Sequence, residues 1–407
     1  TAGVARIEIR PTAGMMEYIE GLAQTATTNA ATALASAIAT AAYAGAFWKN
    51  AIKDFGCVAD GATDDTDGLQ DSVDWAFDYG GTVFYPQGKY MGTAVSKVVS
   101  GAGMGPAKFV GASAPGALQT ANKGTWFQQI SGNTGTFINF AGDWGTNPNW
   151  PVFGLQMSDI GIKSSDACAG WALDMFNVTN RHDDFRNLTI YVPNVGAAGG
   201  WRCRSCWSVN IDNIEMRGPG SGSSRGLVFY GDAQGAVSDG TANMTTIKNV
   251  NIQYFGSCNM QLGKWQESGG GFAHSFTIIG GQVGHATGYG IVFGRVNDVT
   301  AIGFHSELNG KSGFMFDAYS ANTQPQNLKF IGCDSYNDGM TATAGTDDAY
   351  GIQVRRGTNI TFDTFRFQEA RFGIAVADSV YTNNIRMNGF LFGAKSAGGS
   401  GTAIKAS

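Results

Sequence analysis

The chain has few charged residues, few prolines and few cysteines for its 407 residues. Asp, Glu, Lys and Arg together make up 14% of it, and it holds 9 prolines and 6 cysteines. So little charge argues against long amphipathic helices, which need a polar face. The six cysteines are too sparse for a disulfide scaffold, and the close pair Cys203 and Cys206 lacks the second pair that a zinc site needs. We therefore expect free thiols, no bound metal and no cofactor.

The sequence also has no excess of basic residues, because its formal net charge is −5. Nucleic acid is held by clustered Lys and Arg that neutralise phosphates, so we expect no nucleic-acid partner. No N-terminal stretch has the charged start, apolar run and cleavage site of a signal peptide, and we expect synthesis in the cytoplasm. Glycine, in contrast, is abundant at 59 residues, which favours strands joined by many tight turns.

Changes of composition divide the sequence into four expected parts. They are residues 1–14, 15–50, 51–90 and 91–407. The first part holds a short alternating run from Val4 to Arg10 that Pro11 closes, which predicts a strand or an extended attachment arm.

Residues 15–50 are dominated by Ala and Thr, with 28 uncharged residues between Glu20 and Lys49. Ala is the best helix former, so this segment predicts a long helix. A membrane span is the alternative reading, but the many Thr side chains and the small transfer energy of Ala disfavour it. Small side chains recur at three- and four-residue steps from Leu22 to Ala41, which predicts a narrow packing seam. We therefore expect an α-helical neck that forms a homotrimer.

An ordered motif opens the third part. It reads Asp54-Phe55-Gly56-Cys57-Val58-Ala59-Asp60-Gly61-Ala62-Thr63-Asp64-Asp65-Thr66. Asp64 or Asp65 can cap a helix that Gly80 ends, and Thr82–Tyr85 predicts the first strand beneath that helix. A stack of coils needs such a lid, because its first coil would otherwise expose apolar core and unpaired strand edges.

This motif resembles the entry module of the pectate-lyase-like superfamily, which includes phage tailspikes and pectin-degrading enzymes. The resemblance covers about residues 51–90. It implies an all-β fold, a right-handed single-stranded parallel β-helix that the Ala-rich helical neck precedes, and it implies carbohydrate as the substrate class. Pectin hydrolases of that superfamily carry Asn-Thr-Asp and Arg-x-Lys motifs, which this sequence lacks. No catalytic residue is therefore carried over from the family.

A two-residue signature, Asn or Asp followed by a branched aliphatic residue, recurs through the fourth part. It occurs at Asp159-Ile160, Asn187-Leu188, Asn213-Ile214, Asn249-Val250, Asp298-Val299, Asn327-Leu328, Asn359-Ile360 and Asn384-Ile385. Ser275-Phe276 fills the one double-length gap, so the steps run from 23 to 36 residues, which is typical of a coil with variable loops. Asn suits such a corner because it tolerates left-handed backbone and can bond to the amide one coil away.

A second column of residues recurs in phase with the first and predicts the inward side chains. Its members are Trp171, Trp201, Leu227, Met260, Ile291, Phe314, Ile352, Ile374 and Ile404. Two columns in phase predict that coils stack in register, so that residues far apart in the sequence become neighbours.

Stacking also aligns outward side chains. Superposing four coils places Gln282, His305, Asp334 and Arg366 in one surface column, and Gly284, Glu307, Tyr336 and Gln368 in the next. Glu307 and Asp334 then lie one coil apart and two residues out of step, with Cα atoms roughly 8 Å apart. That spacing falls within the ~6.5–9.5 Å carboxyl separation of inverting glycosidases. The alternative is that these polar side chains only solvate the surface.

We therefore expect Glu307 and Asp334 to be the catalytic acid and base. The residues expected to bind the substrate are His305, Arg366, Tyr336, Gln282, Asp317 and Arg355. The first hypothesis is a phage tailspike that acts as an endo-glycosidase, which hydrolyses bonds within the chain of a bacterial surface polysaccharide. The alternatives are an adhesin that binds glycan without turnover, and a lyase in which His305 or Tyr336 removes a proton while Arg366 neutralises a carboxylate.

The same hypothesis predicts the setting of the protein. We expect it in the virion tail, where residues 1–14 would join tail or baseplate proteins, and we expect it to act at the bacterial surface.

Overall fold

The computed structural model divides the chain into two units, Thr1–Trp48 and Lys49–Ser407. The residues that the structure describes are 14, 17, 20–30, 32, 47–100, 106–116, 123–143, 151–179, 184–232, 241–265, 271–317, 324–339, 350–368, 372–376, 382–392 and 404–406. In the first unit, residues 20–30 are helical and exposed. The expected arm and most of the expected neck lie outside the described residues, so the helical neck and its trimer stay predictions. No helix in the described ranges is long and apolar enough to cross a membrane.

Two helices lie near the start of the second unit. They are α2 (Ala51–Phe55) and α3 (Thr66–Tyr79). As expected, α3 ends at Gly80, whose φ of 66° is left-handed. Asp64 accepts a hydrogen bond from the Thr66 amide at 2.9 Å and so caps the helix. Asp65 makes no cap bond and instead accepts from backbone amides outside the helix, that of Met91 among them.

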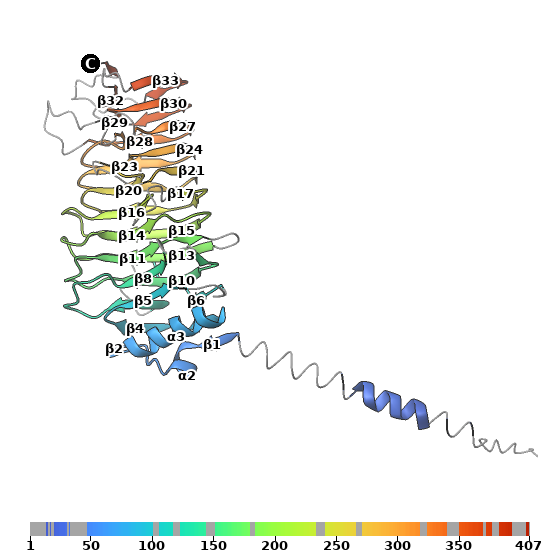
Figure 1. The fold of residues 1–407 in the computed structure, drawn as a ribbon. Helices are drawn as coiled ribbons and strands as arrows, with labels where there is room; N and C mark the ends of the chain where they lie inside the picture. The colour runs from blue at the N-terminus through green and yellow to red at the C-terminus, as the bar shows by residue number, and fades with distance from the viewer. Residues whose placement is uncertain are drawn as a thin grey trace, which may run out of the picture. The chain divides into compact units, whose positions relative to one another are not determined.

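Parallel strands make up most of the second unit (Figure 1). One sheet has 11 strands: β5 (Val95–Val99), β8 (Ile138–Gly142), β11 (Trp171–Phe176), β14 (Gly199–Arg204), β16 (Arg225–Tyr230), β20 (Cys258–Leu262), β23 (Tyr289–Phe293), β26 (Phe314–Phe316), β29 (Tyr350–Val354), β32 (Phe372–Val376) and β35 (Ile404–Ala406). Its spatial order follows the chain order, so each coil adds one strand beside the last. This is the arrangement of a parallel β-helix.

The other strands of the coils belong to a sheet of 22 strands. They are β1 (Trp48–Asn50), β2 (Asp60–Asp64), β3 (Thr82–Tyr85), β4 (Gly88–Gly92), β6 (Lys108–Gly111), β7 (Thr125–Gln129), β10 (Gln156–Lys163), β13 (Asp184–Tyr191), β15 (Asn210–Arg217), β17 (Ala242–Asn243), β18 (Thr246–Lys248), β19 (Asn251–Gln253), β21 (Ala273–Ile279), β22 (Gln282–Gly284), β24 (Val296–Ile302), β25 (His305–Glu307), β27 (Gln326–Ile331), β28 (Asp334–Tyr336), β30 (Gly357–Asp363), β31 (Arg366–Gln368), β33 (Thr382–Asn388) and β34 (Leu391–Phe392). Two further strands, β9 (Val152–Phe153) and β12 (Val178–Thr179), pair with each other.

The predicted Asn edge is confirmed. All nine corner positions, Ser275 included, have φ between 51° and 60°. Side-chain amides connect successive coils along this edge, as where Asn359 donates to Asn327 at 3.0 Å and Asn384 donates to Asn359 at 2.7 Å. These bonds help to fix the register of the stack, because most corner amides donate to the corner of the coil before, whereas Asn249 donates to Asp212, the residue just before a corner.

The inward column is confirmed at every described side chain except Trp171. Trp201 pairs with Leu173, which is fully buried, whereas Trp171 pairs with Gly199. A Cβ on Gly199 would lie 2.5 Å from the Trp171 ring, so the glycine leaves room for the indole on the outer face, where Arg202 lies 5.1 Å from the ring centroid. The expected register was therefore wrong by two residues in that coil. All six cysteines are free and buried.

Candidate functional site

Two columns of outward side chains follow the short strands β22, β25, β28 and β31. The first column holds Gln282, His305, Asp334 and Arg366, and the second holds Gly284, Glu307, Tyr336 and Gln368. Each strand has three residues, and the middle one is buried, so the first and third side chains point outward together. The register predicted from the sequence is thus confirmed for both columns.

His305 lies between the two candidate catalytic carboxylates. Its Nδ1 is 2.8 Å from Asp334 Oδ1, and its Nε2 is 3.3 Å from Glu307 Oε2. The three side chains are about a quarter exposed, at 27%, 24% and 23%. Gly284 makes room for this arrangement, since a Cβ there would lie 2.8 Å from Glu307 Cγ. The second oxygen of Glu307 faces His285, whose Nε2 is 3.9 Å away. The result is a solvent-accessible row of carboxylate, imidazole and carboxylate.

The hydrogen bond to Asp334 raises the pKa of His305 above its ordinary value of 6.5. Burial acts in the opposite direction, and the Glu307 carboxylate adds to the increase. His305 therefore holds its proton to higher pH than a free imidazole does.

We expect Asp334→Asn to lower the pKa of His305, because an amide cannot stabilise the imidazolium as a carboxylate does. Histidine-selective NMR titration of the folded protein measures it, with His305→Asn assigning the resonance. Asp363→Asn is the matched control, since this acid lies on β30 outside both columns. An unchanged His305 titration in Asp334→Asn would show that the contact does not form in solution.

The remaining predicted residues fall into two groups. Arg366 is exposed at the end of the first column, and its guanidinium donates to the side-chain oxygen of Gln368, with Nη2 at 2.6 Å once that amide is turned toward it. Gln282 donates to Asn251 at 3.1 Å, and Tyr336 is half-buried in the second column. Asp317 and Arg355 form an ion pair at 3.6 Å. This pair follows strands β26 and β29 of the 11-stranded sheet, so the structure does not bring it to the columns.

A buried polar network lies on the inner side of the same strands, and the repeat pattern did not predict it. Asp338 is fully buried and accepts hydrogen bonds from the Asn309 amide side chain at 2.8 Å and from the Ser335 hydroxyl at 2.6 Å. Asn309 also donates to Ser306 at 3.0 Å, and Ser306 separates His305 from Glu307 along β25. Burial raises the pKa of Asp338 to about 6. The network thus fastens β25 and β28 to each other from within.

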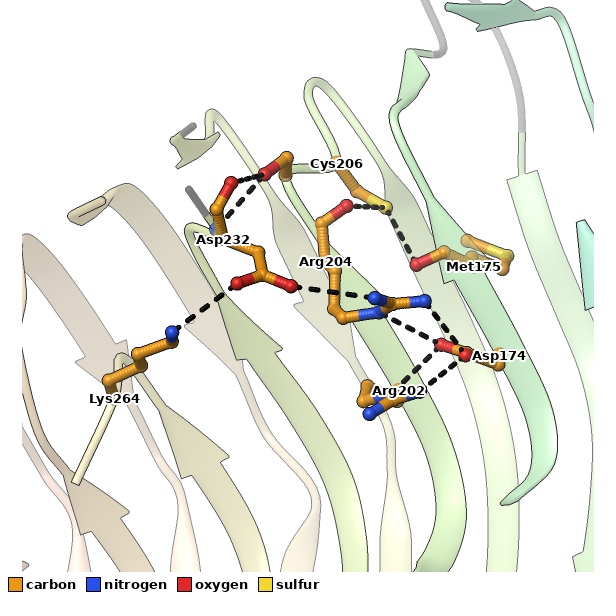
Figure 2. Close-up of polar contacts among 8 residues, drawn as sticks. Asp174, Met175, Arg202, Arg204, Cys206, Asp232 and Lys264 are labelled. Atoms are coloured by element: carbon orange, nitrogen blue, oxygen red, sulfur yellow. Dashed lines mark hydrogen bonds and ion pairs between the residues drawn. The ribbon is translucent and has the colours of Figure 1, made fainter. Parts of the chain in front are cut away.

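Figure 2 shows a second polar cluster, on the outer face of the 11-stranded sheet. Asp174 accepts from Arg202 at 2.5 and 2.9 Å and from Arg204 at 3.0 Å. Arg204 also reaches Asp232, which Lys264 contacts at 3.3 Å. The charges pair with one another across several coils, so this cluster presents no unpaired charge among the residues drawn. The repeat pattern did not predict this cluster. Strand register fixes which backbone positions are neighbours, but it does not fix which ion pairs the long Arg and Lys side chains form.

Comparisons with known proteins bear on the fold. No protein-family model and no curated protein sequence matches the chain. Among solved structures, the enzymatically active domain of bacteriophage CBA120 tailspike protein 2 has a TM-score of 0.51 at 12% identity, over 88% of this chain and 45% of its own. An exopolygalacturonase from Thermotoga maritima has a TM-score of 0.52 at 9% identity, over 85% and 91%. This chain has the pectin-lyase-like parallel β-helix fold.

Another neighbour of this pectin-lyase-like β-helix is PfbA, a surface adhesin of Streptococcus pneumoniae. It has a TM-score of 0.55 at 13% identity, over 88% of this chain and 91% of its own. The β-helix chain spans from 40% to 63% of the length of the viral chains that match it with TM-scores above 0.5. Enzymes and an adhesin share this fold, so function has to be argued from the site.

Proposed function

We propose that the protein binds and hydrolyses a bacterial surface polysaccharide at the row formed by Glu307, His305 and Asp334. The observation that carries the proposal is the placement of His305 within hydrogen-bond reach of both carboxylates on an accessible face. Glycosidic cleavage needs one group that protonates the leaving oxygen and one that activates water. Two carboxyl groups separated by an imidazole supply both.

In the proposed hydrolysis, the three side chains of this row supply and accept the protons that the reaction needs. The imidazolium of His305 gives its Nε2 proton to Glu307, and Glu307 transfers that proton to the leaving glycosidic oxygen as the bond to the sugar carbon breaks. Asp334 stays ionised and takes a proton from the water whose oxygen attacks that carbon. Both sugar products are neutral at the cleaved bond. Asp334 then releases the proton that it took from water to the solvent, and the imidazole takes a proton from the solvent at Nε2.

We also propose that this activity belongs to a phage tailspike. The similarity to the CBA120 tailspike domain supports this setting. In it, residues 1–14 would join tail or baseplate proteins, the Ala-rich segment would hold a homotrimer, and the β-helix would meet the bacterial polysaccharide. Host cytoplasm would be the place of synthesis.

A glycan-binding adhesin is the second candidate. The similarity to PfbA favours it. Binding alone requires polar contacts and no proton transfer, so the same columns could serve it.

Purified full-length protein, incubated with a panel of bacterial capsular and exopolysaccharides, distinguishes these functions. We expect viscosity to fall and new reducing ends to appear without absorbance from unsaturated sugars. That absorbance would instead indicate a lyase, and retention without cleavage would indicate the adhesin. Neither binding nor cleavage of any polysaccharide would contradict both proposals.

A further inference from the structure

The second column continues for five coils before the catalytic row. From Glu307 toward the N-terminal coils, its members are Glu307, Gly284, Gln253, Arg217, Tyr191 and Lys163. All of them lie at the outward third position or at the end of a strand in the same sheet, so their side chains share one face. At ~4.8 Å per coil, the line from Lys163 to Glu307 is ~24 Å long. We call residues 163, 191, 217, 253 and 254 the basic track.

Two cation and tyrosine pairs shape the basic track. Lys163 Nζ lies 5.7 Å from the Tyr191 ring centroid, and the Arg217 guanidinium lies 4.8 Å from that of Tyr254. Tyr254 also stacks on His285, with centroids 4.8 Å apart and planes 9° apart, and His285 faces Glu307. The pairs are half-buried, so the aromatic rings hold the cations in place at the surface. This chain of contacts leads from Arg217 directly to the catalytic row.

The cations of the track have no carboxylate partner within the part of the chain that the structure describes. Among the described residues, Lys163, Arg217 and Arg366 form no ion pair with a carboxylate, whereas Arg202, Arg204 and Lys264 of the other sheet do. The protein as a whole carries a formal charge of −5, which repels polyanions. These positive groups lack a carboxylate partner and lie on one face of a protein whose net charge is negative. An anionic ligand therefore gains the most electrostatic binding energy at this face.

We infer that the polysaccharide is acidic, and that its carboxylate or other anionic groups bind Lys163 and Arg217 while the chain lies along the track toward Glu307. Arg366 binds an anionic group beyond the cleavage point. This inference rests on the proposed function and adds the substrate class. Because Lys163 and Glu307 are ~24 Å apart, only a polymer that spans five coils reaches both. Short oligosaccharides therefore bind more weakly than long ones.

Affinity electrophoresis tests the inference with full-length protein in native gels that contain one polysaccharide each. The acidic probes are xanthan, gellan and hyaluronan, and the neutral probes are dextran, levan and curdlan. The variant Lys163→Met/Arg217→Met removes both charges and keeps unbranched side chains of similar length over the tyrosines. Lys329→Met, on an exposed position of β27 outside the columns, removes one positive charge and is the matched control for each single variant, Lys163→Met and Arg217→Met.

We expect at least one acidic probe to retard the wild type, with retardation that falls as salt rises. Each removed charge weakens that binding by roughly tenfold, which makes roughly a hundredfold for the double variant, while Lys329→Met binds like the wild type. Retardation by neutral probes alone, by no probe, or equally for wild type and double variant overturns the inference. Cleavage of a neutral polysaccharide would leave the proposed hydrolysis standing and remove only the acidic substrate.

Discussion

Glu307→Gln is expected to lower the rate of polysaccharide cleavage by roughly 10²–10⁴-fold, the usual contribution of a general acid or base. The substitution preserves the shape of the side chain over Gly284 and leaves an oxygen that can face His305. It removes the group that carries the proton from Nε2 to the leaving oxygen. The loss should appear in turnover and leave binding nearly unchanged, because an amide can still contact sugar hydroxyls.

Reducing-end release and affinity electrophoresis on the same polysaccharide separate these two effects. Asp363→Asn serves as the control, because it removes one acid from the same sheet without touching either column. A Glu307→Gln protein that cleaves at the wild-type rate would remove Glu307 from the mechanism. Loss of binding together with cleavage would instead indicate that Glu307 is a binding residue, as the adhesin alternative requires.

The register of the site could be predicted from the sequence because the repeat constrains it strongly. A left-handed corner occurs once in each coil, so counting from Asn327 or Asn359 fixes which residues meet on the next strand. Adjacent strands then bring His305 beside Asp334, whatever the loops between them do. The same counting failed at Trp171, because the coil there has its inward residue two positions later and Gly199 admits the indole outside.

Contacts that depend on side-chain conformation could not be predicted in this way. The sequence placed His305 among the binding residues, whereas the structure puts it between Glu307 and Asp334, and that difference changes its expected role. Asp338 lies in a turn just after β28, at a position that the repeat pattern does not mark. It is buried because Gly313 leaves room: a Cβ at that glycine would lie 2.1 Å from Asp338 Oδ2. The space that one glycine leaves for one side chain does not recur from coil to coil, so the repeat pattern cannot predict it.

Asp338 makes the stability of the β-helix depend on pH. Its pKa is raised from an ordinary 3.8 to about 6 by burial, and the donors around it, Ser335 and Asn309, only partly offset that effect. The folded state therefore binds a proton that the unfolded state has already released between about pH 4 and pH 6. A pKa difference of about two units corresponds to about 3 kcal/mol. This contribution is fully present below pH 4 and is lost as the pH rises through 6.

We expect Asp338→Asn to abolish this dependence, because an amide does not ionise and can still bond to Asn309 and Ser335. The free energy of unfolding of the wild type minus that of the variant should fall by about 3 kcal/mol between pH 4 and pH 7. Urea unfolding at the two pH values measures the free energy of unfolding of both proteins. Asp363→Asn is the control, because it shows whether the loss of another acid from the same sheet gives the same change. A difference that stays constant would mean that Asp338 is ionised throughout this range. The fastening of β25 to β28 would then be a buried charge held by amides and hydroxyls, which Asp338→Asn would weaken equally at both pH values.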